Sequence, residues 1–242
     1  MFKNKSSSTK LMLGLGAAAA FLSAGSLFAN TTTISGTGWV PTNNIVSYGG
    51  YKTTGGTDSY SAGYSSSYGG SALMTITNSA YWTEAWVGTP PAYNGNLGAL
   101  RYDSMSITVP STTGPGQPYT LFGVSDVNGD NFDIINFGSN TNAYTLDGSS
   151  TVGVWNTKTY TWAEQNVQLS SIYDTPYNGI DYGDMMVNAA WASIGAYGSS
   201  GNNATAYISS MSITSTPEPA TLALLAVGGL GLLLKRRRKA IA

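Results

Sequence analysis

The sequence predicts an all-β domain, an antiparallel β-sandwich or jelly roll of about ten short strands. The aromatic side chains are the first indication: all six tryptophans and all sixteen tyrosines lie between residues 30 and 215, among abundant Thr, Ser, Gly and Asn. This composition suits half-buried pleated sheets joined by tight turns. The second indication is the pattern, because short runs of alternating character recur there without a sustained helical period.

Each expected strand is a run of this kind between turn signals such as Asn94-Gly95 and Asp147-Gly148. The strands are expected at 33–40, 71–78, 81–88, 100–109, 118–126, 131–137, 151–155, 159–169, 185–194 and 204–214. So many short strands favour two packed sheets over one open sheet.

A pentapeptide, Ser-Met-Ser-Ile-Thr, occurs twice, at Ser104–Thr108 and at Ser210–Thr214. Alternate residues of a strand share a face, so both copies are expected to bury Met and Ile and to expose Ser and Thr. Two interpretations fit: duplication of a half-domain, and independent use of a favourable strand pattern. The second copy ends the domain and is expected to be its closing strand.

Residues 47–71 are rich in Gly, Ser and Tyr and contain little aliphatic bulk. They are expected to form a flexible loop, because such a segment buries too little apolar surface to offset the ordering of its glycines. The alternative is an adhesive or sugar-stacking segment, since tyrosine rings offer a large contact area with few rotatable bonds.

The first residues of the chain, 1–29, have the features of a secretory signal peptide. A basic start is followed by an apolar run, Leu11–Leu22, and by small residues suited to cleavage. Cleavage is expected after Ala29, with Ser26 as the alternative position. The exported domain is therefore expected to span residues 30–215.

The last residues, 216–242, combine a Pro-Glu-Pro triplet, an apolar run at 220–234 and a basic run at 235–239. As a helix, the apolar run would rise roughly 22 Å, short of the roughly 30 Å hydrocarbon core, and long basic side chains can reach the headgroups to cover the difference. The basic run is expected to stay in the cytoplasm, with the domain on the other side of the membrane. A simple C-terminal anchor would have the same features.

The order of these three parts resembles the PEP-CTERM sorting tail of Gram-negative bacteria. The residues that carry the resemblance are Pro217, Glu218, Pro219, Arg236, Arg237 and Arg238. The resemblance implies that a membrane-embedded exosortase recognises the tail, removes it and releases the domain outwards. The implied partners are exosortase and the secretion machinery, with a transient transmembrane helix in the inner membrane and an extracellular or cell-surface destination.

The domain is strongly acidic, with eleven carboxylates against Lys52, Arg101 and Lys158, which gives a formal charge of −8. Such a surface has no basic patch that could bind nucleic acid or anionic lipid. The chain contains neither cysteine nor histidine, which excludes disulfides, thiolate nucleophiles, Cys/His zinc sites and histidine-based triads. No cofactor is expected other than calcium, which binds through oxygen ligands.

One acidic run presents oxygen side chains with the spacing that opens a calcium loop. The candidate ligands are Asp126, Asn128, Asp130 and Asp133. The run lacks the glycine and the bidentate glutamate that complete such a loop. The competing interpretation is a β-hairpin that turns at Asn128-Gly129, and the two are not exclusive.

The candidate glycan-binding residues are Trp82, Trp86, Trp162 and Tyr160. Glu84 is expected between the first two on one strand face, and Glu164 beside Trp162. Exposed rings of this kind can stack against pyranose faces while nearby carboxylates bind sugar hydroxyls. The alternative is that the tryptophans belong to the core.

Three functions are consistent with these observations. The first is a non-catalytic, extracellular or surface-associated component of an exopolysaccharide or biofilm matrix, as the PEP-CTERM resemblance implies. The second is a carbohydrate-binding module that recognises a defined glycan through exposed Trp and Tyr. The third is a glycan-degrading enzyme, which would need Glu84 and Glu164 in one cleft. We expect the non-catalytic function and assign no catalytic residue.

Overall fold

The computed structural model describes residues 29–43, 45–52, 58–79, 82–89, 97–114, 117–137, 143–173, 175–196 and 202–216. The signal peptide up to residue 28, the expected transmembrane helix and the sorting residues from Pro217 onwards lie outside these ranges. Within them, no helix has the length and apolar character needed to cross a membrane. Thr31–Ser215 forms one compact unit.

The described residues form an all-β domain whose strand pairs are antiparallel, as predicted. Sheet A has the order β1 (Asn30–Ser35), β15 (Ser210–Ser215), β6 (Asp103–Thr108), β10 (Ala143–Leu146). Sheet B has the order β12 (Thr161–Gln168), β11 (Thr151–Asn156), β9 (Asn131–Phe137), β8 (Gln117–Ser125), β13 (Met186–Ala196), β5 (Thr83–Gly88), β2 (Ser47–Lys52). Sheet C has the order β3 (Ser59–Ser65), β4 (Ser71–Ser79), β14 (Asn202–Ile208), β7 (Ser111–Thr113).

The helical segments of this part of the chain are short 3-10 turns. They are η2 (Gly36–Trp39), η3 (Pro41–Asn43), η4 (Ser67–Gly69), η6 (Leu100–Tyr102), η7 (Leu169–Ile172) and η8 (Tyr182–Asp184). They connect strands and close the ends of the core: Trp39 is fully buried, and its indole N–H donates to the carbonyl of Ser209.

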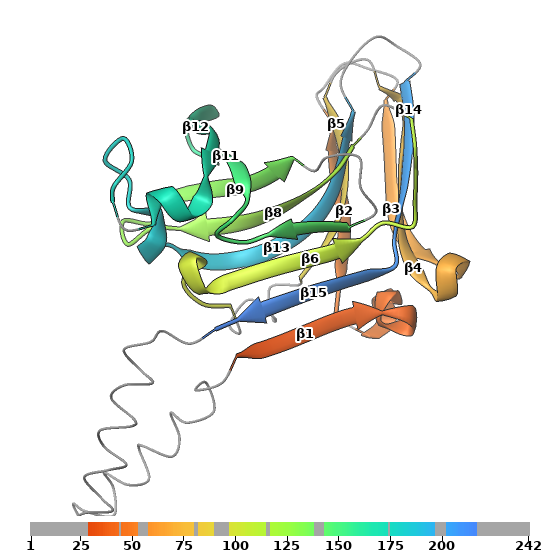
Figure 1. Ribbon diagram of the computed structural model, residues 1–242. Helices are drawn as coiled ribbons and strands as arrows, with labels where there is room; N and C mark the ends of the chain where they lie inside the picture. The colour runs from red at the N-terminus through yellow and green to blue at the C-terminus, as the bar shows by residue number, and fades with distance from the viewer. Residues whose placement is uncertain are drawn as a thin grey trace, which may run out of the picture. The chain divides into compact units, whose positions relative to one another are not determined.

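Sheets A and C are joined by strands that bend from one sheet into the other. β14 continues into β15 through Ser209 alone, and β6 continues into β7 through Val109 and Pro110. Figure 1 shows the bend, with β14 rising steeply and β15 running across the view. Sheet A contacts sheet B through β6 and β10, and sheet C contacts it through β3, β4 and β14, with buried side chains of all three sheets in one core. Both therefore cover the same face of sheet B.

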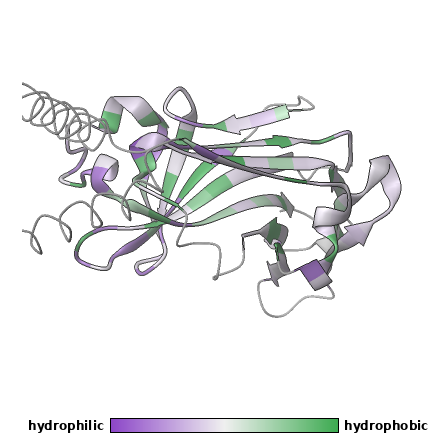
Figure 2. Cartoon of the chain, turned by 90° about the horizontal axis from the view of Figure 1, so that it is seen from below, coloured by the Kyte–Doolittle hydropathy of each residue, from purple (hydrophilic) through white to green (hydrophobic). Residues whose placement is uncertain are grey.

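The core lies between these layers. Apolar side chains from all three sheets form one buried cluster, including Met74, Met105, Phe122, Ile134 and Val154. Figure 2 shows the hydrophobic residues concentrated along the strands and the hydrophilic residues mainly in the loops. Removing this apolar surface from water is the main favourable term in folding.

The repeated pentapeptide pairs with itself. β6 and β15 are neighbours, with Met211 opposite Ile107 and Ile213 opposite Met105. All four side chains are buried, and the alternate Ser and Thr residues face outwards, as predicted. The second copy is the last strand of the unit.

The outer face of sheet A carries small hydroxyl side chains. Its exposed or half-exposed positions are Thr31, Thr33, Ser104, Ser106, Thr145, Ser212 and Thr214. Neighbours on adjacent strands are hydrogen-bonded, with 2.8 Å between the hydroxyls of Thr31 and Thr214 and 2.8 Å between those of Thr33 and Ser212. This face is an ordinary solvated sheet surface.

The expected loop at 47–71 is wrong for its described residues, because β2 and β3 are edge strands of sheets B and C. The glycines have a packing role: a Cβ on Gly49 would lie 2.3 Å from the Trp86 ring, and one on Gly50 would lie 2.2 Å from the Tyr60 ring. The small side chains of this segment therefore leave room for aromatic rings of neighbouring strands, and they do not prevent the segment from forming strands.

The strand boundaries differ from expectation in further places. The expected strand at 33–40 is wrong beyond Ser35, because Gly36–Trp39 is the 3-10 turn η2. The run at 204–214 is two strands, because the chain changes sheets at Ser209. The short strands β7 and β10 were not expected, and the described residues contain fifteen strands rather than about ten.

Candidate functional site

The outer face of sheet B, opposite to the core, carries most of the large aromatic side chains of the sheet. We call it the aromatic face, and its rings are Tyr51, Trp82, Trp86, Tyr119, Phe137, Trp155, Trp162 and Trp191. Strand alternation places them there: Tyr51 lies opposite Glu84, Tyr119 opposite Phe137, and Trp155 opposite Trp162, while the inner positions between them are apolar and buried.

The rings form two groups of neighbours along the sheet. On β9, β11 and β12, the centroid of Phe137 lies 5.9 Å from that of Trp162, which lies 5.2 Å from that of Trp155. Phe137 also lies 5.8 Å from Tyr119 on β8. On β5 and β13, Trp86 lies 6.1 Å from Trp191. These are ordinary distances for favourable aromatic pairs, so the rings hold one another in place.

Glycines on neighbouring strands make room for the rings to lie against the sheet. A Cβ on Gly195 would lie 2.3 Å from the Trp82 ring, and one on Gly88 would lie 1.8 Å from Trp191. A Cβ on Gly153 would lie 2.7 Å from Trp162. Together with Gly49 under Trp86, these positions require glycine because a ring approaches the backbone closely.

Several of these rings are open to solvent. The exposed fractions are 57% for Tyr51, 53% for Phe137 and 39% for Trp162. Trp82, Trp86, Trp155 and Trp191 are half-buried, and Tyr119 is buried. Sheet B thus presents large rings at the kind of position where sheet A presents Ser and Thr.

Two carboxylates lie among the rings. Glu84 on β5 interacts with the side chains of Tyr119, Ser193 and Trp82, and burial raises the pKa of this carboxyl group. Asp133 on β9 lies on the same face as Tyr119, and burial together with the charge of Glu84 raises its pKa to about 6. Burial raises the pKa of the Tyr119 hydroxyl, and the charges of Glu84 and of Asp133 raise it further.

The structure brings together part of the predicted glycan site. Trp82, Glu84 and Trp86 share one face, as predicted, and Trp162 lies on the same face at the other end of the sheet. Tyr160 is 76% exposed, but it lies in the turn before β12 with φ of 55° rather than on the strand beside Trp162.

Glu164 is not on the aromatic face. It is buried opposite Val154, and its carboxylate accepts a 2.8 Å hydrogen bond from Asn178. Irregular pairing between β11 and β12 on either side of Val154 interrupts the alternation that was expected to place it beside Trp162. The expected pair of glutamates is therefore not formed, and the carboxylate that interacts with Glu84 is Asp133.

Three of the four expected calcium ligands, Asp126, Asn128 and Asp130, lie together in one loop, and Asp133 does not. Asp126 and Asp130 close a hairpin loop between β8 and β9, where Asp126 Oδ1 accepts backbone N–H bonds from Asn128 and Asp130 at 2.9 Å each. Gly129 has φ of 81° and donates to the Asp126 carbonyl. The hairpin prediction is confirmed, with the five residues Asp126–Asp130 between the two strands instead of a two-residue turn.

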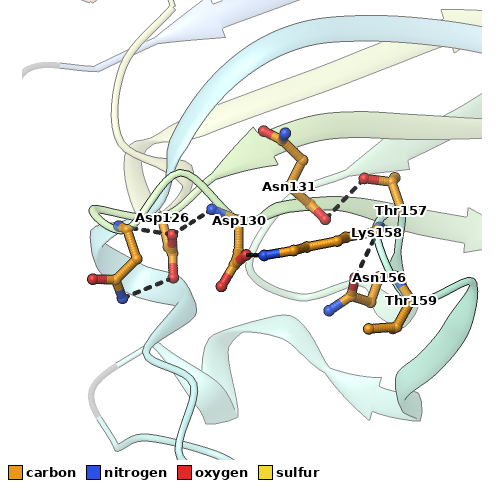
Figure 3. A network of polar contacts seen from close by, with 8 residues as sticks. Asp126, Asp130, Asn131, Asn156, Thr157, Lys158 and Thr159 are labelled. Atoms are coloured by element: carbon orange, nitrogen blue, oxygen red, sulfur yellow. Dashed lines mark hydrogen bonds and ion pairs between the residues drawn. The ribbon is translucent and has the colours of Figure 1, made fainter.

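The remaining oxygen side chains of this loop have other partners. Asp130 Oδ1 forms a 3.0 Å ion pair with Lys158 Nζ, and this contact links the loop to the β11–β12 turn (Figure 3). Asp133 lies on the aromatic face instead of in the loop. Among the described residues, no group of three or more acidic side chains is arranged to hold a metal ion.

Sequence reasoning missed several members of the aromatic face. Trp191, Tyr119, Phe137 and Trp155 were not proposed, and Asp133 was assigned to the calcium loop. Alternation within each strand could have indicated which of these side chains share a face of their own strand. The order of the strands in the sheet, which brings them together, could not be read from the sequence.

Residues 215–239 match the protein-family description "PEP-CTERM protein-sorting motif". The chain carries a PEP-CTERM sorting motif. This confirms the resemblance drawn from the tail. No curated protein matches the chain.

Several solved structures show a distant likeness to the chain. The family 11 carbohydrate-binding module of the Clostridium thermocellum cellulase Lic26A-Cel5E is 9% identical, with a TM-score of 0.39, and covers 78% of this chain and 98% of its own. A mannan-recognising module, TmCBM27, is 8% identical, with a TM-score of 0.35 and coverage of 78% and 99%. An exo-β-agarase is 11% identical, with a TM-score of 0.32 and coverage of 69% and 24%. Scores this low carry no information on the ligand.

Proposed function

We propose that this protein is exported, sorted through its PEP-CTERM tail and retained in an extracellular polysaccharide matrix, where the aromatic face of sheet B binds a glycan. It acts as a non-catalytic recognition component. The observation that supports this proposal is the row of exposed and half-exposed rings on the outer face of sheet B.

The outer face of sheet B exposes large aromatic rings to solvent. Contiguous apolar patches on monomeric proteins commonly mark binding sites. Sheet A of the same domain is covered by Ser and Thr at its outer positions, so the fold itself does not require aromatic side chains at such positions. Rings held against glycines present their faces with little freedom left to lose on binding, which favours stacking against the apolar faces of pyranose rings.

Polar groups among the rings complete a sugar-binding surface. Ligand sites combine apolar walls with a few oriented polar groups that fix specificity. The carboxylates of Glu84 and Asp133 can accept hydrogen bonds from sugar hydroxyls, and the Tyr119 hydroxyl interacts with both of them. Hydrogen bonds to a charged group contribute about 1.5–3 kcal/mol each.

The targeting segments support an extracellular location. A PEP-CTERM motif implies processing by an exosortase, which makes that enzyme and the secretion machinery the partners of export. The signal peptide and the transient inner-membrane helix at 220–234 belong to this proposal, followed by release to the cell surface or the medium. A glycan-degrading activity of Glu84 with Glu164 is not part of it, because Glu164 is buried with Asn178 and Val154.

Binding to the exopolysaccharide of an exosortase-bearing host and to a glycan array tests the proposal, with the full chain purified in mild detergent. Trp162→Ala is the first variant, because this ring is exposed on an edge strand and its removal should leave the fold intact. We expect at least about tenfold weaker binding. Thr33→Ala on the outer face of sheet A is the matched control and should bind normally.

Two outcomes would contradict the proposal. One is the absence of saturable binding to every glycan by a folded protein. The other is equal binding by the native chain and by a Trp86→Ala, Trp162→Ala double variant, which would place any glycan site elsewhere.

A further inference from the structure

The charge on the aromatic face narrows the class of glycan that it can bind. Glu84 on β5 and Asp133 on β9 lie on the same face of sheet B, separated by strands β13 and β8, and the Tyr119 hydroxyl on β8 interacts with both. The two carboxylates repel each other, because the charge of Glu84 acts on Asp133. The charged form of each carboxylate is stabilised by a cation placed close to it.

The domain supplies no cation to this pair. Between residues 30 and 215 the only basic residues are Lys52, Arg101 and Lys158, and the structure describes all three. Lys52 Nζ donates to the carbonyl of Asp58 at 3.0 Å, and Lys158 Nζ pairs with Asp130 at 3.0 Å.

The third cation, Arg101, is also engaged elsewhere. Its guanidinium donates to the carbonyl of Tyr173 at 2.8 Å and pairs with Asp184 at 3.6 Å, in the region of η6 and η8. None of the three basic residues is a cause of the pKa shift of Glu84 or of Asp133. The positive charge that this face lacks can therefore come from a ligand.

We infer that the aromatic face binds an amino-sugar polysaccharide with free amino groups, whose sugar rings stack on the tryptophans and whose ammonium groups donate to Glu84 and to Asp133. This inference rests on the proposed function and names its ligand class. A polymer of uronic acids is disfavoured for the same reason, because each carboxylate would approach an uncompensated acidic pair on a domain of formal charge −8.

The position of the rings around the pair fits this ligand. Trp82 interacts with Glu84 directly, and Trp86 follows two residues later on the same face. Trp155 lies opposite Asp133 in the register of β9 and β11. A sugar stacked on a ring at either carboxylate would bring an amino group on its edge within reach, and a cation close to an aromatic face gains a further attraction.

Four oligosaccharides with the same β-1,4 linkage test the inference on the full chain in mild detergent: hexaglucosamine, hexa-N-acetylglucosamine, cellohexaose and hexamannuronate. Calorimetry close to neutral pH, above the pKa of about 6 of Asp133, is expected to show hexaglucosamine binding about tenfold more tightly than cellohexaose. Hexamannuronate should bind most weakly. Raising the salt concentration should reduce the preference for hexaglucosamine, because exposed charge interactions are screened.

Isosteric variants separate charge from shape. Glu84→Gln and Asp133→Asn should each weaken binding of hexaglucosamine severalfold more than binding of cellohexaose, and so reduce the preference for hexaglucosamine. Asp184→Asn removes the same charge from an exposed position beside Arg101 and should keep the preference, which makes it the matched control.

The results also distinguish this inference from the function on which it rests. If cellohexaose or hexa-N-acetylglucosamine binds through Trp162 and hexaglucosamine binds no more tightly, the amino-sugar inference is overturned and glycan recognition stands. The same conclusion follows if the preference survives in both carboxylate variants. If none of the four ligands and no host polysaccharide binds to the folded protein, both proposals fail.

Discussion

Replacing Asp133 with Asn should stabilise the protein at neutral pH, and the gain should vanish in acid. Burial on the aromatic face and the charge of Glu84 raise the pKa of Asp133 to about 6 in the folded protein. In the unfolded chain, which lacks both effects, the pKa of an aspartate is about 3.9. The folded protein therefore holds this proton more tightly than the unfolded chain does.

The sign and size of the effect follow from this difference. Below about pH 4 the carboxyl group is protonated in both states and does not affect the native protein's stability. Between about pH 4 and about 6 the unfolded chain loses the proton first, so the native protein becomes less stable relative to the variant. About 2 pKa units correspond to at most about 3 kcal/mol, and partial solvent screening lowers the expected gain to about 1–3 kcal/mol.

Urea unfolding of both proteins across this pH range measures the effect as a difference in free energy of unfolding. Asp184→Asn serves as a control, because this carboxylate is exposed and its ion pair with Arg101 should contribute no more than about 1 kcal/mol. An advantage of Asp133→Asn that is the same in acid and at neutral pH would refute the electrostatic account of the aromatic face. A loss of stability at neutral pH would refute it as well.

Two further pairs of variants test the packing. Gly49→Ala would place a Cβ 2.3 Å from the Trp86 ring and should destabilise the protein by about 1–3 kcal/mol, whereas Gly63→Ala, which meets nothing within 4 Å, should be nearly neutral in urea unfolding. Met211→Ala should cost about 2–5 kcal/mol, because the side chain is fully buried in the core. Ser212→Ala, on the outer face of the same strand, should stay within about 0.5 kcal/mol, and equal losses from Met211 and Ser212 would contradict the assigned strand faces.

Local pattern was enough to predict much of the fold. The alternation in Ser104–Thr108 and Ser210–Thr214 correctly separates buried Met and Ile from exposed Ser and Thr, because one side of sheet A is covered by sheet B. It could not show that the two copies pair with each other. That pairing depends on contacts between residues about a hundred positions apart, which no local pattern encodes.

The candidate site depends on the same non-local information. Composition alone suggested a loop at 47–71. A strand there needs glycine at position 49 because Trp86 lies on the neighbouring strand, and the sequence does not show which strands are neighbours. Chain proximity grouped Asp133 with the residues of the hairpin loop, but strand alternation turns it towards the aromatic face. Irregular pairing beside Val154 displaced Glu164 from that face, and such irregularities have no clear sequence signal.

Oxidative footprinting of the tryptophans with and without a bound glycan tests the central claim most directly. The full chain would be treated with a tryptophan-selective oxidant, and the modified residues would be quantified by mass spectrometry. The account predicts that glycan protects Trp86, Trp162 and Trp191, while the fully buried Trp39 is unreactive in both states. Saturable glycan binding that leaves the reactivity of Trp86, Trp162 and Trp191 unchanged would show that the aromatic face is not the binding site.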